Sequence, residues 1–213
     1  MQVYGRRSSI NVQKVLWCLA ELGFAEGREF SRIDAGLEFG VIDTPPYRAL
    51  NPNGLVPTLV DGECVLWESN TIVRYLAAKY DAQTLLPSEP AARADVERWM
   101  DWQLGTLWAT LRVAFLGLTR VPEEQRDYDA IKRSYREATR LLGIADAALA
   151  KHDYLAQDRF TVADIGVGLA AHRWVHLAER FADVLQAPQP LPSLDRWLQA
   201  VKGRPAFSVA VAP

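Results

Sequence analysis

The chain has 213 residues, enough for one large domain or two modest ones. Hydrophobic residues make up 49% and charged residues 23%, a balance that excludes disorder as the main description. The 24 basic and 26 acidic side chains give a net charge of -2 without a basic stripe, so we expect no nucleic-acid partner. No apolar stretch is long enough to span a bilayer, no secretion signal opens the chain, and two cysteines form no disulfide framework. A cytoplasmic protein with no membrane partner is therefore expected.

The first part of the chain alternates strand-like and helix-like patterns. A short strand at 3–4 precedes a helix over 12–22, where apolar residues recur at the spacing of one helical face. Gly23 follows that helix, and glycine is the usual residue beyond a helix C-terminus. A second strand is predicted at 30–33, and 36–54 is mostly loop with one turn of helix near Tyr47.

A β-hairpin is predicted next. Two strand-like runs, 57–60 and 64–67, flank Asp61-Gly62, a pair typical of tight turns. Helical spacing returns over 69–80. The order β-α-β followed by β-β-α predicts a parallel pair plus an antiparallel hairpin in one mixed sheet.

The remainder of the chain is helical in pattern. Residues 82–90 carry two prolines and indicate a linker between a first domain, 1–81, and a second domain, 91–213. In the second domain we predict a long helical stretch over 91–118 and a helix that restarts at Pro122. A further helix is predicted to begin at Thr161, and a last short helix is predicted around Trp197. The predicted fold class is α/β plus all-α.

Four segments, in order and spread over nearly the whole chain, resemble the cytosolic glutathione S-transferases. They are Ser-Ser-Ile-Asn at 8–11, Asn-Pro-Asn-Gly-Leu-Val-Pro-Thr-Leu at 51–59, Glu68-Ser69, and Phe-Thr-Val-Ala-Asp-Ile at 160–165, with Arg-Pro-Ala-Phe at 204–207 in support. The active-site segment is similar to bacterial serine- or asparagine-type members, theta-like or nu-like. The resemblance implies a thioredoxin-like N-terminal domain that holds glutathione, a helical-bundle C-terminal domain that walls the electrophile pocket, and a homodimer.

Under this resemblance Ser9 and Asn11 are the catalytic residues. A thiol with a pKa near 8.5 must lose about two units to ionise at neutral pH, which costs about 2.7 kcal/mol. A hydrogen bond to a charged group supplies about 1.5–3 kcal/mol, and a helix N-terminus about 0.3–2. The Ser9 hydroxyl at the first helix is therefore a sufficient thiolate stabiliser, although a helix N-cap is its alternative role. The Asn11 amide donates equally well, and we rank it second.

The resemblance also implies the residues that bind glutathione. A cis bond between Val56 and Pro57 presents the Val56 backbone to the cysteinyl unit, although an ordinary loop proline fits the sequence too. Glu68 pairs with the γ-glutamyl ammonium, and Ser69 opens a helix whose free N–H groups bind the α-carboxylate. As alternatives, Ser69 caps this helix and Glu68 is a plain exposed acid. Leu55 departs from relatives that place Lys or Gln there to meet the glycyl carboxylate.

Trp108, Arg112 and Phe115 lie at helical spacing and are candidates for the electrophile pocket, although most aromatic stripes are core. Arg6 and Arg7 add positive potential near the thiolate or are simply solvated. No third ligand accompanies His172 and His176, so no metal is expected.

The leading hypothesis is a glutathione transferase that conjugates the glutathione thiolate to a small apolar electrophile, with glutathione as co-substrate. A second hypothesis keeps the fold and changes the reaction to disulfide or peroxide reduction, isomerisation or dehalogenation. A third is a non-catalytic glutathione-binding or regulatory protein.

Overall fold

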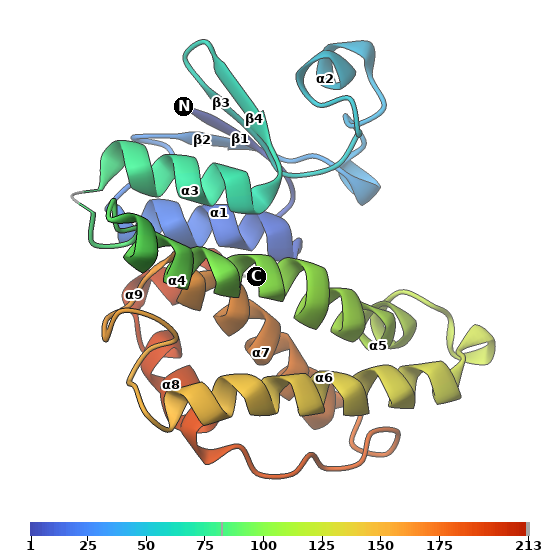
Figure 1. Ribbon diagram of the computed structural model, residues 1–213. Coiled ribbons are helices and arrows are strands. Elements are labelled where there is room, and N and C mark those ends of the chain that lie inside the picture. Colours follow the sequence, from blue (N-terminus) through green and yellow to red (C-terminus); the bar gives the residue numbers. More distant parts are fainter. Residues whose placement is uncertain (82, 212–213) are drawn as a thin grey trace. The chain divides into compact units, whose positions relative to one another are not determined.

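The computed structural model describes residues 1–81 and 83–211, and they form two compact units (Figure 1). The first unit contains Met1–Ser88 and the chain from Gly203 onward, and the second contains Glu89–Lys202. Residue 82, which opens the predicted 82–90 linker, and residues 212–213, which end the predicted second domain, lie outside the described residues. The predicted domain limits themselves stay a prediction.

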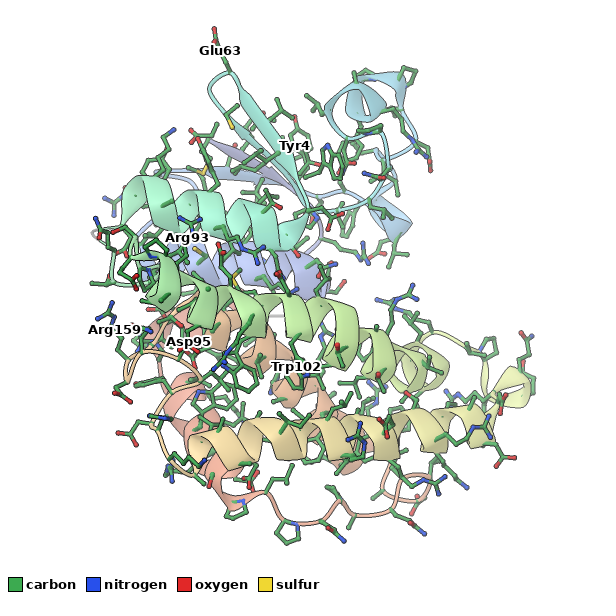
Figure 2. All side chains as sticks on the ribbon, in the orientation of Figure 1. Tyr4, Glu63, Arg93, Asp95, Trp102 and Arg159 are labelled. Atoms are coloured by element: carbon green, nitrogen blue, oxygen red, sulfur yellow. The ribbon has the colours of Figure 1, made fainter. Side chains whose placement is uncertain are left out.

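A four-stranded mixed sheet forms the framework of the first unit. Its order is β2-β1-β3-β4, with β1 and β2 parallel and the other neighbours antiparallel, as predicted. Gly62 takes a φ of 64° in the hairpin turn, and Glu63 lies at its tip (Figure 2). The strands are β1 Gln2–Tyr4, β2 Ser31–Ile33, β3 Thr58–Asp61 and β4 Cys64–Trp67.

Two helices, α1 and α3, pack side by side on one face of this sheet (Figure 1). Each buries an apolar stripe, and Val3 on β1 is fully buried in the core. Gly23 follows α1 with a φ of 79°, the left-handed conformation expected beyond the helix end. The helices of this unit are α1 Ile10–Glu21, η1 Leu37–Phe39, α2 Pro45–Leu50, α3 Ser69–Tyr80 and α9 Pro205–Val211. Helix α9, which the sequence did not separate from the preceding helix, packs on α1.

The second unit is helical throughout its regular structure. The predicted stretch over 91–118 is continuous, but it contains a π-helical segment between α4 and α5. The prediction that a helix restarts at Pro122 is wrong. Pro122 precedes only a short 3₁₀ turn, Glu123–Gln125, and α6 begins where the Asp127 carboxylate accepts a bond from Ala130 N at 2.9 Å. The elements are α4 Pro90–Trp102, η2 Gln103–Trp108, α5 Ala109–Thr119, η3 Glu123–Gln125, α6 Tyr128–Leu149, α7 Val162–Arg180 and α8 Pro192–Lys202.

A fully buried carboxylate, Asp164, organises the start of α7. It completes the capping box with Thr161, accepting from Thr161 N at 2.9 Å. It also accepts from Leu155 N at 3.2 Å and from Trp197 Nε1 at 2.9 Å. Burial raises the pKa of Asp164 to about 6, while these three donor contacts lower it. One side chain therefore joins a loop, the start of α7 and α8.

We expect Asp164→Ala to lower the free energy of unfolding by at least about 3 kcal/mol, because each of three buried donors left unsatisfied costs about 1–3 kcal/mol. Urea denaturation measures the loss. Asp129→Ala, which removes an exposed acid in the first turn of α6, is the matched control and should cost less than about 1 kcal/mol. Equal losses in the two variants would contradict the role of Asp164.

Candidate functional site

The N-termini of α1 and α3 meet in the first unit. The Ser69 hydroxyl in the first turn of α3 donates to Asn11 Oδ1 on α1 at 3.3 Å. One turn further along α1, Lys14 Nζ donates to Asn70 Oδ1 at 3.2 Å. Two helix N-termini, each with free N–H groups, are thereby held next to each other, an arrangement suited to an anionic ligand.

Ser9 is the N-cap residue of α1 by its backbone. Its carbonyl accepts from Gln13 N at 2.9 Å, and its φ and ψ of -81° and 123° are those of an N-cap. Its hydroxyl, however, makes no capping hydrogen bond to the helix. The half-buried side chain thus keeps its hydroxyl for another partner at the helix N-terminus.

Asn11 lies in the first turn of α1 and is also half-buried. Because its Oδ1 accepts the Ser69 hydroxyl, its amide N–H groups remain as the donors of this side chain. The structure therefore brings together Ser9, Asn11 and Ser69 from two helices that the sequence placed 58 positions apart.

Glu68 precedes α3 in a backbone conformation that side chains rarely adopt. Its φ is 69°, which costs a residue other than glycine about 1–3 kcal/mol and is concentrated at ligand sites. Its side chain is exposed, whereas Ser69 is 3% exposed. Glu68, not Ser69, is the residue at the N-cap position, so the alternative in which Ser69 caps this helix is wrong.

The peptide bond between Val56 and Pro57 is cis, as the resemblance implied. Two buried residues fix the loop that leads to it. Tyr47 Oη and Asn51 Nδ2 both donate to the Leu55 carbonyl, at 2.6 and 2.9 Å. Leu55 itself exposes 63% of its surface. Tyr47 and Asn51 had no recognisable signal as loop supports, since their contact depends on how the loop closes.

Comparison with known proteins agrees with this geometry. The sequence profile of the glutathione S-transferase N-terminal domain matches residues 3–84, and that of the glutathione S-transferase C-terminal domain matches residues 108–205. The chain is 41% identical over 211 residues to glutathione S-transferase GstB of Escherichia coli strain K12, covering 98% of this chain and 96% of that protein. The chain belongs to the glutathione S-transferase family.

Solved structures agree. The theta class glutathione S-transferase from Xanthomonas axonopodis pv. citri, determined with glutathione bound, superposes with a TM-score of 0.90 at 44% identity, covering 100% of this chain and 97% of that one. In sequence the chain is also similar to glutathione S-transferase 3 of Zea mays, with 31% identity covering 100% of this chain and 93% of that protein. The predicted family, fold class and enzyme class are thus confirmed.

The predicted pocket residues of the transferase lie on η2 and α5 in the second unit. Trp108 is 8% exposed, and its ring lies 5.5 Å from that of Phe115. Arg173 on α7 lies over both rings, 4.6 Å from the centroid of Phe115. Arg112 is exposed, and within the described residues the cation–π contacts of this pair are with Arg173 and not with Arg112. The cation beside the aromatic pair is therefore Arg173, which the sequence did not single out.

Within residues 1–81 and 83–211 no three His, Cys, Asp or Glu side chains are grouped to hold a metal ion, and His172 and His176 lie 6.5 Å apart by ring centroids. No helix in the described part of the chain could cross a membrane.

Lys14, which joins α1 to α3 beside the candidate site, is a residue that the sequence analysis missed. It is 1% exposed, inside α1 and among its apolar stripe. Burial lowers the pKa of Lys14 to about 7; Glu68 opposes this shift and Arg74 reinforces it. A lysine in an otherwise apolar helical face was the available signal, because an unpaired buried cation is costly.

Between about pH 7 and 10 the unfolded chain holds one more proton at Lys14 than the folded chain, so folding becomes more favourable as pH rises. The slope from this group reaches about 1.4 kcal/mol per pH unit. Lys14→Met should lose this slope between about pH 7.5 and 9.5 in denaturation curves. Lys132→Met, at an exposed site on α6, should follow the unchanged protein; parallel curves for Lys14→Met would contradict the assignment.

Proposed function

We propose that the protein conjugates the thiolate of glutathione to a small apolar electrophile, and that the Ser9 hydroxyl stabilises this thiolate. The observation that carries the proposal is that this hydroxyl sits at the start of α1 without capping the helix. One hydrogen bond to the thiolate supplies about 1.5–3 kcal/mol, and the helix N-terminus adds about 0.3–2. Together they cover the roughly 2.7 kcal/mol that ionisation at neutral pH requires.

The γ-glutamyl end of glutathione binds at the start of α3 in this proposal. Glu68 pairs with the ammonium group from its exposed position, and the free N–H groups that follow Ser69 bind the α-carboxylate. The backbone at the Val56–Pro57 bond pairs with the cysteinyl unit, like an added strand. Glutathione in the Xanthomonas relative supports this ligand for the chain.

We further propose a homodimer in the cytoplasm. An apolar hollow of about 370 Å³ between α4 and α6 supports a second copy as partner, and Figure 2 shows Trp102 there. Ile144, also in its lining, exposes 46% of its surface. Both cysteines are free, as suits a reducing compartment.

Trp108 and Phe115, with Arg173 over them, form the wall that meets an apolar electrophile, and Arg112 has a lesser role.

A second candidate is glutathione-dependent disulfide reduction. The Ser69 contact to Asn11 Oδ1 favours it, because this contact turns the amide donors of Asn11 away from Ser69 and leaves them for a sulfur ligand. In that reaction Asn11 rather than Ser9 would hold the thiolate.

Titration of thiolate absorbance for bound glutathione distinguishes the two candidates. Ser9→Ala should raise the pKa of the bound thiol by about one to two units, since it removes one hydrogen bond to a charged group. Asn11→Ala should change it less, and Ser8→Ala is the matched control on the same loop. If Asn11→Ala carries the larger effect, disulfide reduction becomes the leading function, and an aryl halide assayed beside a disulfide substrate checks it.

Leu55→Lys should strengthen glutathione binding, because an ammonium there can pair with the glycyl carboxylate. An exposed ion pair of about 0.2–1 kcal/mol corresponds to a KM for glutathione lower by up to about fivefold. The KM for glutathione monoethyl ester, which lacks that charge, should stay the same. Val65→Lys on β4 is a matched control at another exposed apolar position. An equal gain for both thiols would show that Leu55 does not face the glycyl end.

A further inference from the structure

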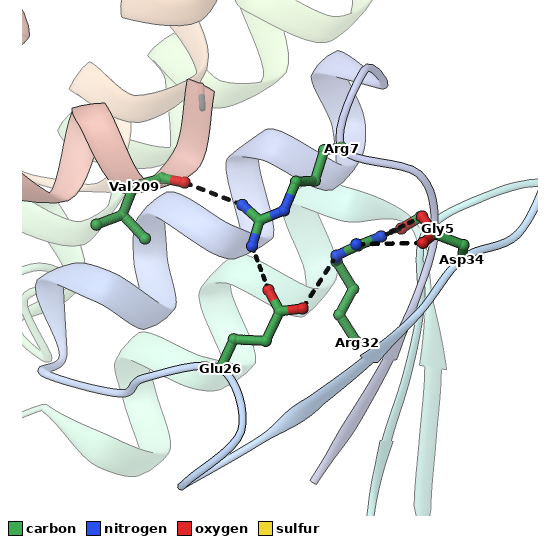
Figure 3. Close-up of polar contacts among 6 residues, drawn as sticks. All are labelled: Gly5, Arg7, Glu26, Arg32, Asp34 and Val209. Carbon is green, nitrogen blue, oxygen red and sulfur yellow. Dashed lines mark hydrogen bonds and ion pairs between the residues drawn. The ribbon is translucent and has the colours of Figure 1, made fainter. Parts of the chain in front are cut away.

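A chain of ionic contacts encloses the loop that leads from β1 to Ser9 (Figure 3). At the start of this loop Arg32 Nη1 donates to the Gly5 carbonyl at 2.9 Å. Two residues before Ser9, Arg7 forms an ion pair with Glu26. Glu26 also pairs with Arg32, at 3.4 Å, so one carboxylate joins both ends of the loop.

The same arginine reaches the other end of the chain. Arg7 Nη1 donates to the Val209 carbonyl in α9 at 3.1 Å, across 202 positions of sequence (Figure 3). A guanidinium can hold a carboxylate with one arm and a carbonyl with the other, since its donors form a rigid fork. Arg7 is 27% exposed in its side chain, so these contacts are partly shielded from water.

Helix α9 is itself firmly attached to α1. Arg204 forms two hydrogen bonds of 2.7 Å with the carboxylate of Glu21. The Phe207 ring packs edge-on against Trp17, with centroids 5.0 Å apart. The position of the Val209 carbonyl is therefore set by contacts at the opposite end of α1 from Ser9.

We propose that Arg7 is a positioning residue that uses docked α9 to fix the Ser9 hydroxyl for thiolate stabilisation. This inference rests on the proposed function of Ser9. Residues 5–8 form no helix or strand of their own. Backbone hydrogen bonds hold the loop at Gly5, Arg6 and Ser9, where Ser9 N donates to the Arg6 carbonyl at 3.2 Å, and the Arg7 contacts add to them. A donor that stabilises a reacting group must be held within about 0.5 Å of its productive position. A small displacement of the Ser9 hydroxyl would therefore weaken its hydrogen bond to the sulfur.

Charge alone does not account for the arrangement. The alternative is that Arg7 acts on the thiolate through its positive charge alone. In that case lysine would serve as well. Lysine keeps the charge but presents a single compact ammonium, which cannot fork between Glu26 and Val209. Loss of Arg204 would leave the charge near Ser9 untouched while loosening α9. Positioning and charge therefore give opposite expectations for Arg7→Lys and Arg204→Gln.

The experiment measures the pKa of the bound glutathione thiol, with kcat and KM, in full-length Arg7→Lys, Arg7→Met and Arg204→Gln. Each should raise the thiol pKa by at least about half a unit and lower kcat near pH 6.5 about twofold or more. The KM for glutathione should change less than about twofold, because the γ-glutamyl contacts on α3 remain. Arg28→Met, whose arginine is 78% exposed in its side chain, is the control and should change nothing.

The double variant Arg7→Lys with Arg204→Gln should lose no more than the larger single loss, since both act on the same contact. Additive losses, or a native thiol pKa in Arg7→Lys, would overturn the inference while leaving Ser9 as the thiolate stabiliser. If the unchanged protein itself does not lower the thiol pKa of bound glutathione, the proposed function of Ser9 fails, and that result is separate from any effect of Arg7. Thermal unfolding of each variant identifies one that loses activity only because it does not fold.

Discussion

The close approach of the N-termini of α1 and α3 is the constraint on which the site depends. Both helices pack on one face of the sheet, and the Ser69 to Asn11 hydrogen bond joins their first turns at 3.3 Å. Each terminus carries unsatisfied N–H groups and a partial positive charge. Two such ends side by side repel weakly unless an anion lies between them. In the proposed function glutathione supplies these anions, a thiolate for one helix and an α-carboxylate for the other.

The fold tolerates unfavourable features where they serve this arrangement. Glu68 holds a left-handed backbone, and Lys14 is almost fully buried with an amide, Asn70 Oδ1, as its acceptor. Neither would be selected for stability alone, because strain and buried charge both destabilise. Lys14 lies one turn beyond the Asn11 contact with Ser69. Its hydrogen bond to Asn70 is a second link between α1 and α3, and it helps to fix their relative position. In the second unit the buried carboxylate of Asp164, by contrast, has hydrogen-bond donors for both of its oxygens.

Local signals in the sequence predicted most of the fold, and contacts between distant residues account for what it missed. The Asp61-Gly62 turn and Gly23 beyond the end of α1 are signals of only one or two residues, and each has one dominant conformation. Ser9, Glu68 and the cis bond at Pro57 came from a resemblance, not from such rules. Val209, which accepts from Arg7, and Asn70, which accepts from Lys14, lie 202 and 56 positions away, and no periodicity in the sequence indicates these contacts. The helix predicted to begin at Pro122 was wrong because a proline that can open an α-helix can also precede a 3₁₀ turn.

In the proposed function, different physical features therefore hold the two ends of the bound tripeptide. At the thiol and γ-glutamyl end, helix termini, a strained backbone and the Arg7 contacts fix donors before the ligand arrives. At the proposed glycyl end the chain presents an exposed apolar side chain, Leu55, at 63%. A carboxylate there stays in water and gains little from binding. Under this proposal the affinity for glutathione depends on the γ-glutamyl contacts, and the reactivity of its thiol depends on Ser9. A change that loosens the loop before Ser9 can thus slow the chemistry while glutathione stays bound.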